Sequence, residues 1–221
     1  MRKLLLILLC LPFIGFGQNV YIPDANFKAY LVGEPLINTN GDTEIQVSEA
    51  NAFNGNIGCA NQNISDLTGI EEFTALNYLN CEGNQLTSLD LSQNSALNIL
   101  YCDNNQLTSL DVSSNTALDY LNCEGNQLIS LDVGNTTPLF EMNCSLNQLT
   151  SLDLSNNSIS HLSCQNNQLT SLDLIGASSL ITLYCDSNNL TNLDLSTNTN
   201  LAYIDCQNNQ LNSLDLSNVT Y

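Results

Sequence analysis

The sequence predicts a β-solenoid, in which one chain winds into stacked coils whose strands pair in parallel. The first observation is a period: beyond Cys10, cysteines recur every 20 to 22 residues from position 59 to position 206, and a fixed short period is typical of repeat architectures. The second is the alternation of apolar and polar residues from Leu100 to Asp103, which indicates a half-buried strand. Because one such unit cannot bury its own apolar face, neighbouring units must share a core.

Each unit carries the pattern L-x-x-L-x-C-x-x-N-x-L-T-S-L-D-L/V-S, followed by a few polar or small residues. A degenerate unit surrounds Cys59. Seven full units follow it, at residues 76–96, 97–117, 118–138, 139–158, 159–179, 180–200 and 201–221. The alternation of Leu110, Asp111 and Val112 predicts a second extended segment in each coil.

The first eleven positions of the unit resemble the leucine-rich repeat, with Cys at the third apolar position of L-x-x-L-x-L-x-x-N-x-L. The run TSLDLS and the segment ISDLTGIEEFTALNYLNC further resemble the short leucine-rich repeats of secreted and surface proteins of Bacteroidetes-type bacteria. This resemblance implies a leucine-rich repeat solenoid over residues 54–221. We expect it to be β-dominated, with parallel strands on one face, extended or turn segments on the other, and a small helical N-terminal cap.

The chain begins with a basic pair, an apolar run and two spaced glycines, Gly15 and Gly17. This order predicts a signal peptide over residues 1–17 and a secreted or cell-surface protein. Lipidation at Cys10 is a weaker alternative, since Leu9 rather than a small residue precedes it. The apolar run is shorter than a transmembrane span, so no membrane insertion is expected.

Residues 18–53 do not repeat and are predicted to cap the first coil. Asp24 precedes an amphipathic helix, and residues 48–53 form a second short one. Between them, residues 38–49 resemble an EF-hand calcium loop, with ligands expected from Asn38, Asn40, Asp42 and Glu49. Thr43 stands where that loop needs glycine. The segment is therefore predicted either to bind Ca²⁺, as the one possible cofactor, or to be a plain capping loop.

The charge balance is strongly acidic, with 3 Lys and Arg against 22 Asp and Glu and a net charge of −19. Such a chain repels phosphate backbones, so it should not bind nucleic acid. With one His and few cations, it lacks the groups that most active sites use to stabilise an oxyanion. The composition favours a protein that is not an enzyme.

Three polar or sulfur positions recur once per unit. We expect the cysteines to be buried as reduced thiols, and the asparagines two residues before the next Leu to satisfy buried backbone groups at a turn. The aspartates of the Leu-Asp-Leu/Val segment either bind divalent cations or accept hydrogen bonds from nearby hydroxyls and backbone amides.

The solvent-facing strand positions vary most between units, and in a solenoid such a face is where ligands bind. Tyrosine gathers there beside acids, which suits protein or carbohydrate recognition, although β-propensity alone also favours Tyr on strands. The predicted contacts are Tyr78, Glu82, Tyr101, Asp103, Tyr120, Glu124, His161, Tyr184, Asp186, Tyr203 and Asp205.

The sequence therefore predicts a recognition or adhesion module that binds a protein or carbohydrate. The alternatives are a glycan-active enzyme and an ice- or mineral-binding solenoid, although Ile129 and Asn212 interrupt the threonine file that ice binding would use. No capping unit follows residues 201–221 in this sequence. We therefore expect either a longer protein or self-association through this coil.

Overall fold

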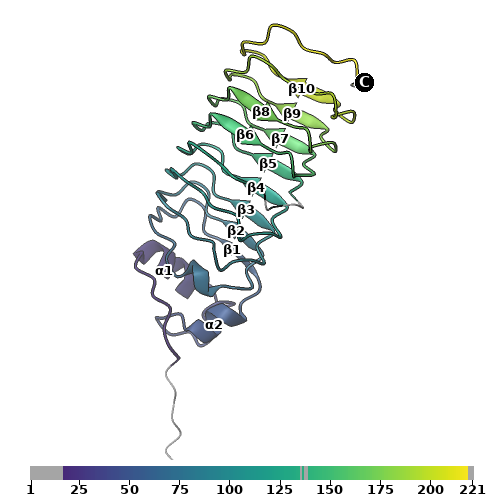
Figure 1. The fold of residues 1–221 in the computed structure, drawn as a ribbon. Coiled ribbons are helices and arrows are strands. Elements are labelled where there is room, and N and C mark those ends of the chain that lie inside the picture. The colour runs from purple at the N-terminus through teal and green to yellow at the C-terminus, as the bar shows by residue number, and fades with distance from the viewer. Residues whose placement is uncertain (1–16, 135, 137–138, 219–221) are drawn as a thin grey trace, which may run out of the picture.

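The structure is a computed structural model that describes residues 17–134, 136 and 139–218. Two helices, α1 (Ala25–Gly33) and α2 (Val47–Ala52), lie at the N-terminal end of a stack of coils, as Figure 1 shows. A short 3-10 helix, η1 (Ile70–Glu72), lies between the first two strands of the main sheet and contacts α2. Most of the predicted signal peptide, residues 1–16, lies outside the described residues.

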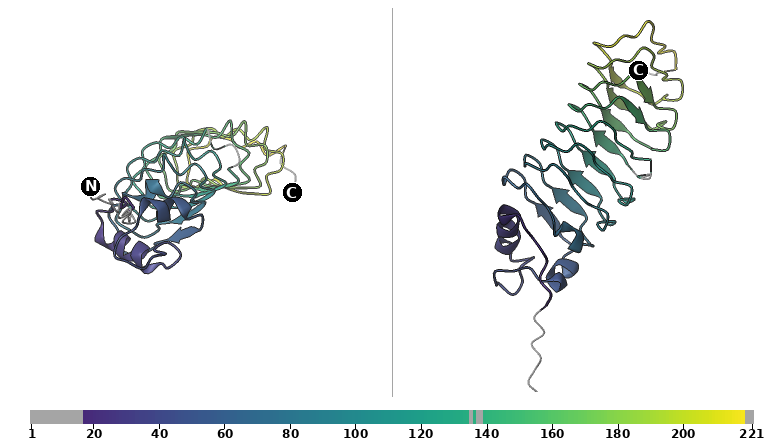
Figure 2. Two further views of the ribbon diagram at one scale, coloured as in Figure 1. Left: turned by 90° about the horizontal axis from the view of Figure 1, so that it is seen from below. Right: turned by 60° about the vertical axis from the view of Figure 1, so that its left-hand side comes forward.

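The coils contribute one strand each to an eight-stranded parallel sheet. Leu79, Leu100 and Leu121 are direct partners in it, so equivalent repeat positions form straight rows across the sheet. The strands are β1 (Asn56–Gly58), β2 (Tyr78–Asn80), β3 (Ile99–Tyr101), β4 (Tyr120–Asn122), β5 (Glu141–Asn143), β7 (His161–Ser163), β9 (Thr182–Tyr184) and β10 (Tyr203–Asp205). This arrangement, visible in the right-hand view of Figure 2, confirms the predicted parallel-strand solenoid.

The second extended segment pairs regularly in only part of the stack. Strands β6 (Ser151–Asp153) and β8 (Ser171–Asp173) form a two-stranded parallel sheet, and a single bridge joins Asp111 to Asp132. In both strands the central Leu is buried between two exposed residues. The alternation predicted there is therefore real, although backbone pairing accompanies it in few coils.

The core is a continuous column of leucines and cysteines. From Cys59 to Cys185 every repeat cysteine is fully buried, and Cys206 is half-buried. All eight are free thiols, as predicted. Burial raises the pKa of Cys59 and Cys144 to about 12, and a neutral buried thiol is a poor nucleophile and metal ligand. The cysteine ladder is thus a packing element.

The predicted asparagine ladder holds successive coils together. In Asn126, the amide nitrogen donates to the carbonyls of Cys102, Cys123 and Glu124, while its oxygen accepts from Leu107 N. The residue before each ladder asparagine is in the left-handed region, at Gly83 and Gly125 but also at Leu146 with φ 54°. The side chain thus supplies partners for backbone groups that the turn leaves unpaired.

A second ladder of asparagines, not predicted from the sequence, lies in the turns that follow the Leu-Asp-Leu/Val segments. Asn94, Asn115, Asn157 and Asn198 are at most 1% exposed, and each donates to two carbonyls, as Asn115 does to Leu91 O and Asn94 O. Thr136 and Ala177 occupy the ladder in the coils between them. Their regular spacing in the sequence is the signal that could identify this ladder, although the repeat pattern describes these positions only as polar or small.

The N-terminal segment covers the first coil. The Asp24 carboxylate caps α1 by accepting from the Asn26 and Phe27 amides, and it also accepts from Ser65 N and Oγ. The Tyr30 hydroxyl accepts from the Gly58 amide on β1. These bonds tie the cap to the repeats, and both helices lie within the segment predicted to form it.

At the other end, Leu211, Leu214 and Leu216 are half-buried and pack against the core. Self-association through this coil stays a prediction. In the part of the chain that the structure describes, no helix is both long and apolar enough to cross a membrane.

Candidate binding surface on the strand face

The outward face of the eight-stranded sheet, called the strand face here, carries the first and third residues of each strand and the residue after each cysteine. Five strands of this sheet, β2, β3, β4, β5 and β7, bury their central residue and leave the flanking ones half-exposed. This pattern follows from the two-residue period of a strand. Since partners align across the sheet, side chains from distant parts of the sequence become neighbours here.

Three tyrosines form a continuous ring cluster over β2, β3 and β4. The Tyr101 ring lies 5.9 Å from the Tyr78 ring and 5.0 Å from the Tyr120 ring, measured between centroids. These separations are within the range of favourable aromatic pairs. Burial and the neighbouring Glu141 carboxylate raise the pKa of Tyr120 far above its usual value. The predicted contacts Tyr78, Tyr101 and Tyr120 are thus brought together.

Three acids, Glu82, Asp103 and Glu124, follow the cysteine in three consecutive coils and so form a row, with Asp103 two residues beyond Tyr101. Glu82 and Glu124 are half-exposed, but Asp103 is only 5% exposed, which differs from the expectation that it faces solvent. Its Oδ2 accepts from Asn104 Nδ2 at 2.8 Å, whereas its buried Oδ1 has no hydrogen-bond partner. Burial, the Glu82 carboxylate and the Glu124 carboxylate raise the pKa of Asp103 above its usual 3.8.

Asparagines fix the backbone around this row. The side-chain oxygens of Asn80 and Asn122 accept from the amides of Glu82 and Glu124, and Asn143 Nδ2 donates to Glu124 Oε2 at 2.7 Å. Because the Asn80 contact goes to the backbone amide, the Glu82 carboxylate keeps its acceptor capacity for a ligand.

A second group of predicted contacts lies over β9 and β10. The rings of Tyr184 and Tyr203 are 5.0 Å apart, and the side chains are 36% and 50% exposed. The acids here have partners within their own coil: Asp186 Oδ2 accepts from Ser187 Oγ, and both oxygens of Asp205 accept from Gln207.

Between the two groups, His161 on β7 packs against the exposed Phe140, with ring centroids 5.4 Å apart. Its Nδ1 lies 3.2 Å from Thr182 Oγ1. Phe140 was not predicted as a surface residue because it precedes its strand by one position. Leu146, 49% exposed in a left-handed conformation, was likewise unforeseen.

The recurrent aspartates lie away from the strand face and are exposed. Each accepts a hydrogen bond from the amide two residues further on, as Asp90 does from Ser92 and Asp132 from Gly134. The hydrogen bonds from Ser92 lower the pKa of Asp90. This is the turn interpretation given above. In the described residues, no group of three or more His, Cys, Asp or Glu side chains is placed to hold a metal ion.

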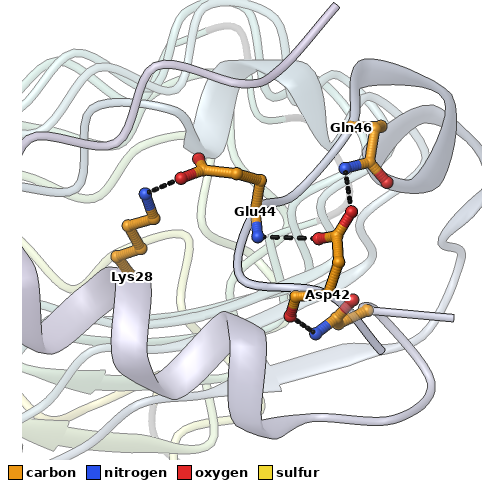
Figure 3. Close-up of polar contacts among 5 residues, drawn as sticks. Lys28, Asp42, Glu44 and Gln46 are labelled. Carbon is orange, nitrogen blue, oxygen red and sulfur yellow. Dashed lines mark hydrogen bonds and ion pairs between the residues drawn. The ribbon is translucent and has the colours of Figure 1, made fainter. Parts of the chain in front are cut away.

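The calcium-like segment is closed by its own hydrogen bonds. Asp42 accepts from Glu44 N and Gln46 Nε2, and Lys28 forms an ion pair with Glu44 at 2.6 Å, as Figure 3 shows. Asn38 turns its amide nitrogen to Val32 O and Asp42 O, and its oxygen accepts from Gly41 N. The carboxylate and amide groups that should bind calcium are therefore engaged within the loop.

Glu49 belongs to the same network. Its Oε1 accepts from Thr39 N, Thr39 Oγ1 and Asn40 N, and its Oε2 accepts from Gln46 N. Burial acts to raise the pKa of Glu49, but these hydrogen bonds outweigh it and lower the pKa. Calcium binding would have to replace these bonds. It stays a prediction, checked by whether calcium raises the melting temperature of the wild type but not of Asp42→Ala/Glu49→Ala.

Comparison with known proteins identifies the family to which the chain belongs. Residues 42–157, just over half of the chain, match the family model described as the leucine-rich repeat domain of the endo-beta-N-acetylglucosaminidase EndoS. The chain therefore belongs to this leucine-rich repeat family.

Among individual proteins, internalin J of Listeria monocytogenes serotype 4b (strain F2365) is 36% identical over 78 residues, which are 35% of this chain and 8% of internalin J. A solved functional domain of internalin J, described as including a cysteine ladder, is 34% identical. That match covers 91% of this chain and 54% of that one, with a TM-score of 0.51. The chain thus spans only part of these relatives.

Two further solved structures agree with the fold. Internalin C2 of Listeria monocytogenes has a TM-score of 0.78 at 20% identity, covering 90% of both chains. The leucine-rich repeat ectodomain of the Arabidopsis thaliana receptor kinase GASSHO1/SCHENGEN3, solved in complex with CASPARIAN STRIP INTEGRITY FACTOR 2, has a TM-score of 0.62 at 25% identity. It covers 66% of this chain and 20% of that one. The protein thus has an internalin-like leucine-rich repeat fold.

Proposed function

We propose that this protein is an exported recognition module that binds a protein partner through its strand face. The observation that carries the proposal is the continuous cluster of Tyr78, Tyr101 and Tyr120 on a rigid sheet, with acids beside it. Tyrosine rings held by neighbouring strands lose little entropy when a partner covers them, and aromatic residues dominate binding energy at protein interfaces. The plant ectodomain solved with its factor is an example of this fold holding a partner.

Export and display at the cell surface are part of the same proposal. They are supported by the signal-like residues 1–17 and by the likeness to internalin J. A strongly acidic surface also keeps such a module soluble and favours association with basic partners.

Carbohydrate is the second candidate ligand. It is favoured by the half-exposed tyrosine rings beside carboxylates, and by the family match to a repeat domain of a glycan-processing protein. It uses the same surface, so one design tests both ligands.

The test is a selection of binders from a random peptide phage library, together with a glycan array, on the protein covering residues 18–221. Binders are then measured against a strand-face variant, Tyr101→Ala/Tyr184→Ala. The matched control changes two exposed residues elsewhere, Ile129→Lys/Ile175→Lys, which are 63% and 62% exposed.

We expect selected peptides to lose at least about tenfold in affinity on the strand-face variant and to be little changed by the control. Equal losses on both variants would contradict the strand face as the binding site. Array glycans that bind, with no peptide selected, would replace the protein partner by a carbohydrate.

A further inference from the structure

The tyrosine–acid patch consists of Tyr78, Tyr101, Tyr120, Glu82, Asp103 and Glu124. Resting on the proposed function of the strand face, we propose that this patch binds an arginine-bearing segment of the partner protein. The guanidinium would lie against the tyrosine rings and donate to the acid row.

Among the described residues, no Lys or Arg pairs with the acid row. Its three carboxylates come from consecutive coils, whose strands lie about 4.8 Å apart in a sheet, so their charges repel one another. Lys28 is the one Lys or Arg among the described residues, and it pairs with Glu44 in the N-terminal cap. Binding a cation from outside would therefore relieve a repulsion that the described chain does not itself relieve.

Asp103, the middle acid of the row, is only partly satisfied by hydrogen bonds. Although 95% of its surface is buried, its Oδ1 has no donor, and leaving a buried charged acceptor unsatisfied costs free energy. It lies on the middle coil of the row, with the Glu82 and Glu124 charges close enough to act on it. A donor that enters between the two glutamates would supply the missing hydrogen bond once the Asp103 side chain turns toward it.

The rings select the kind of cation. A guanidinium is planar, stacks on aromatic faces, and presents five donors that can reach several carboxylate oxygens at once. A lysine ammonium is a compact, strongly hydrated charge that cannot stack in this way. A metal ion fits poorly because, in the described residues, no three acids are placed to share one. Neutral sugar hydroxyls would leave the charge of the row in place.

The experiment measures binding of fluorescein-labelled hexa-arginine by fluorescence anisotropy, at an ionic strength of about 0.15 M, which screens distant charges. The patch variant is Glu82→Gln/Asp103→Asn/Glu124→Gln. The control variant, Asp186→Asn/Asp205→Asn/Asp215→Asn, removes the same charge from residues away from the patch. The single variant Asp103→Asn covers the case in which the patch triple fails to fold, as judged by circular dichroism.

We expect the patch triple to weaken hexa-arginine binding at least about tenfold, the control triple less than about threefold, and Asp103→Asn by about threefold. Tyr101→Leu should weaken hexa-arginine binding but leave the weaker hexa-lysine binding unchanged. Equal losses in both triples would show diffuse attraction to an acidic surface and overturn the proposal, as would equal affinity for hexa-lysine or no binding to the wild type.

Failure here can be told apart from failure of the proposed function. Library peptides that depend on Tyr101 and Tyr184 but contain no arginine would leave the strand face as the binding site and remove only the arginine. Binding of chitotetraose that is lost in Tyr101→Leu but kept in the patch triple would likewise overturn the cationic ligand in favour of a glycan.

Discussion

Two tyrosine groups lie on the same sheet of this protein, and they differ in how their acids are satisfied. Over β2 to β4, three rings accompany a row in which Asp103 is buried and keeps one oxygen without a partner. Over β9 and β10, two rings accompany Asp186 and Asp205, whose hydrogen bonds come from their own coils. Asp103 and Asp186 stand at the same repeat position, whereas Asp205 precedes its cysteine.

The difference shows that the repeat fixes where a side chain stands, while its neighbours in adjacent coils fix its chemistry. Asp103 and Asp186 both follow the repeat cysteine. Asp103 has a glutamate on either side in the sheet direction, whereas Asp186 lies between Gln165 and Gln207. The carboxylates around Asp103 repel one another, and a cationic ligand would reduce that repulsion. Asp186 has no charged neighbour at the same repeat position in the adjacent coils.

The largest expected difference between the regions of the two tyrosine groups is in the stability that their ladder asparagines contribute. Asn126→Ala should lower the free energy of unfolding by about 3 kcal/mol, since it leaves several buried backbone groups without partners. Asn209 makes the equivalent bonds to Cys185, Cys206 and Gln207 but is half-buried, so water can replace them. Asn209→Ala should therefore cost about 1 kcal/mol.

Urea unfolding of the two ladder variants measures this directly. Similar losses at the two positions would mean that water does not reach the last described coil, and that the contrast between the two ends is smaller than their exposure implies.

The next largest expected effect is the loss of stability when a tyrosine ring is removed from either group. Tyr101→Ala removes contacts with two rings and should cost about 2 kcal/mol, whereas Tyr203→Ala removes one contact from a half-exposed side chain and should cost less than about 1 kcal/mol. Thermal unfolding followed by circular dichroism ranks the two variants. A larger loss for Tyr203→Ala would indicate that the pair over β9 and β10, not the cluster over β2 to β4, is the rigid one.

A feature of this protein can be predicted from the sequence when it depends only on position within one repeat unit. It cannot be predicted when it depends on how side chains of neighbouring residues and coils pack. The period of Cys81, Cys102 and Cys123 was enough to predict the coil stack, the buried thiols and the ladder of asparagines, because each depends on position within one unit. The grouping of Tyr78 with Tyr101 and Tyr120 also follows from the register. The solvent-facing surface was predicted as a whole on that basis.

The burial of Asp103 did not follow from the repeat, because it depends on how Asn104 and the flanking glutamates pack around it. The repeat pattern predicts whether a side chain points into the core or outward, but not how much of it the neighbouring side chains cover. Phe140 was missed for a related reason, since its contact with His161 comes from a residue outside the alternating positions. The closed hydrogen bonds of residues 38–49 likewise needed coordinates.

Neutralising one acid in each group gives a smaller effect with a defined pH dependence. Asp103→Asn should stabilise the protein by about 1 kcal/mol at neutral pH, because it removes a buried charge with an unsatisfied oxygen. Asp205→Asn should be close to neutral. The pKa of Asp103 is raised in the folded protein, so as the pH falls the folded state binds the Asp103 proton before the unfolded state does. In that pH range the wild type regains the stability that the buried charge costs it at neutral pH.

The gain from Asp103→Asn should therefore be constant above the raised pKa of Asp103 and shrink as the pH falls through it toward the usual 3.8. Urea unfolding at a series of pH values gives this profile. A gain that does not change with pH would attribute the effect to packing, and a loss of stability would mean that the Asp103 carboxylate is held by donors in solution.

The smallest effect is expected at an exposed aspartate of β6, and its sign is opposite. Hydrogen bonds from the Ser155 backbone and side chain lower the pKa of Asp153 below 3.8, so its charged form contributes stability above that pH and loses it as the pH falls through the lowered pKa. Asp153→Asn should cost no more than about 0.5 kcal/mol at neutral pH, as is usual for a surface change. This small loss should vanish only in acid, at a lower pH than the Asp103→Asn gain. If both variants changed stability in the same direction across that range, overall negative charge would control the pH dependence, and the distinction between a satisfied and an unsatisfied carboxylate would fail.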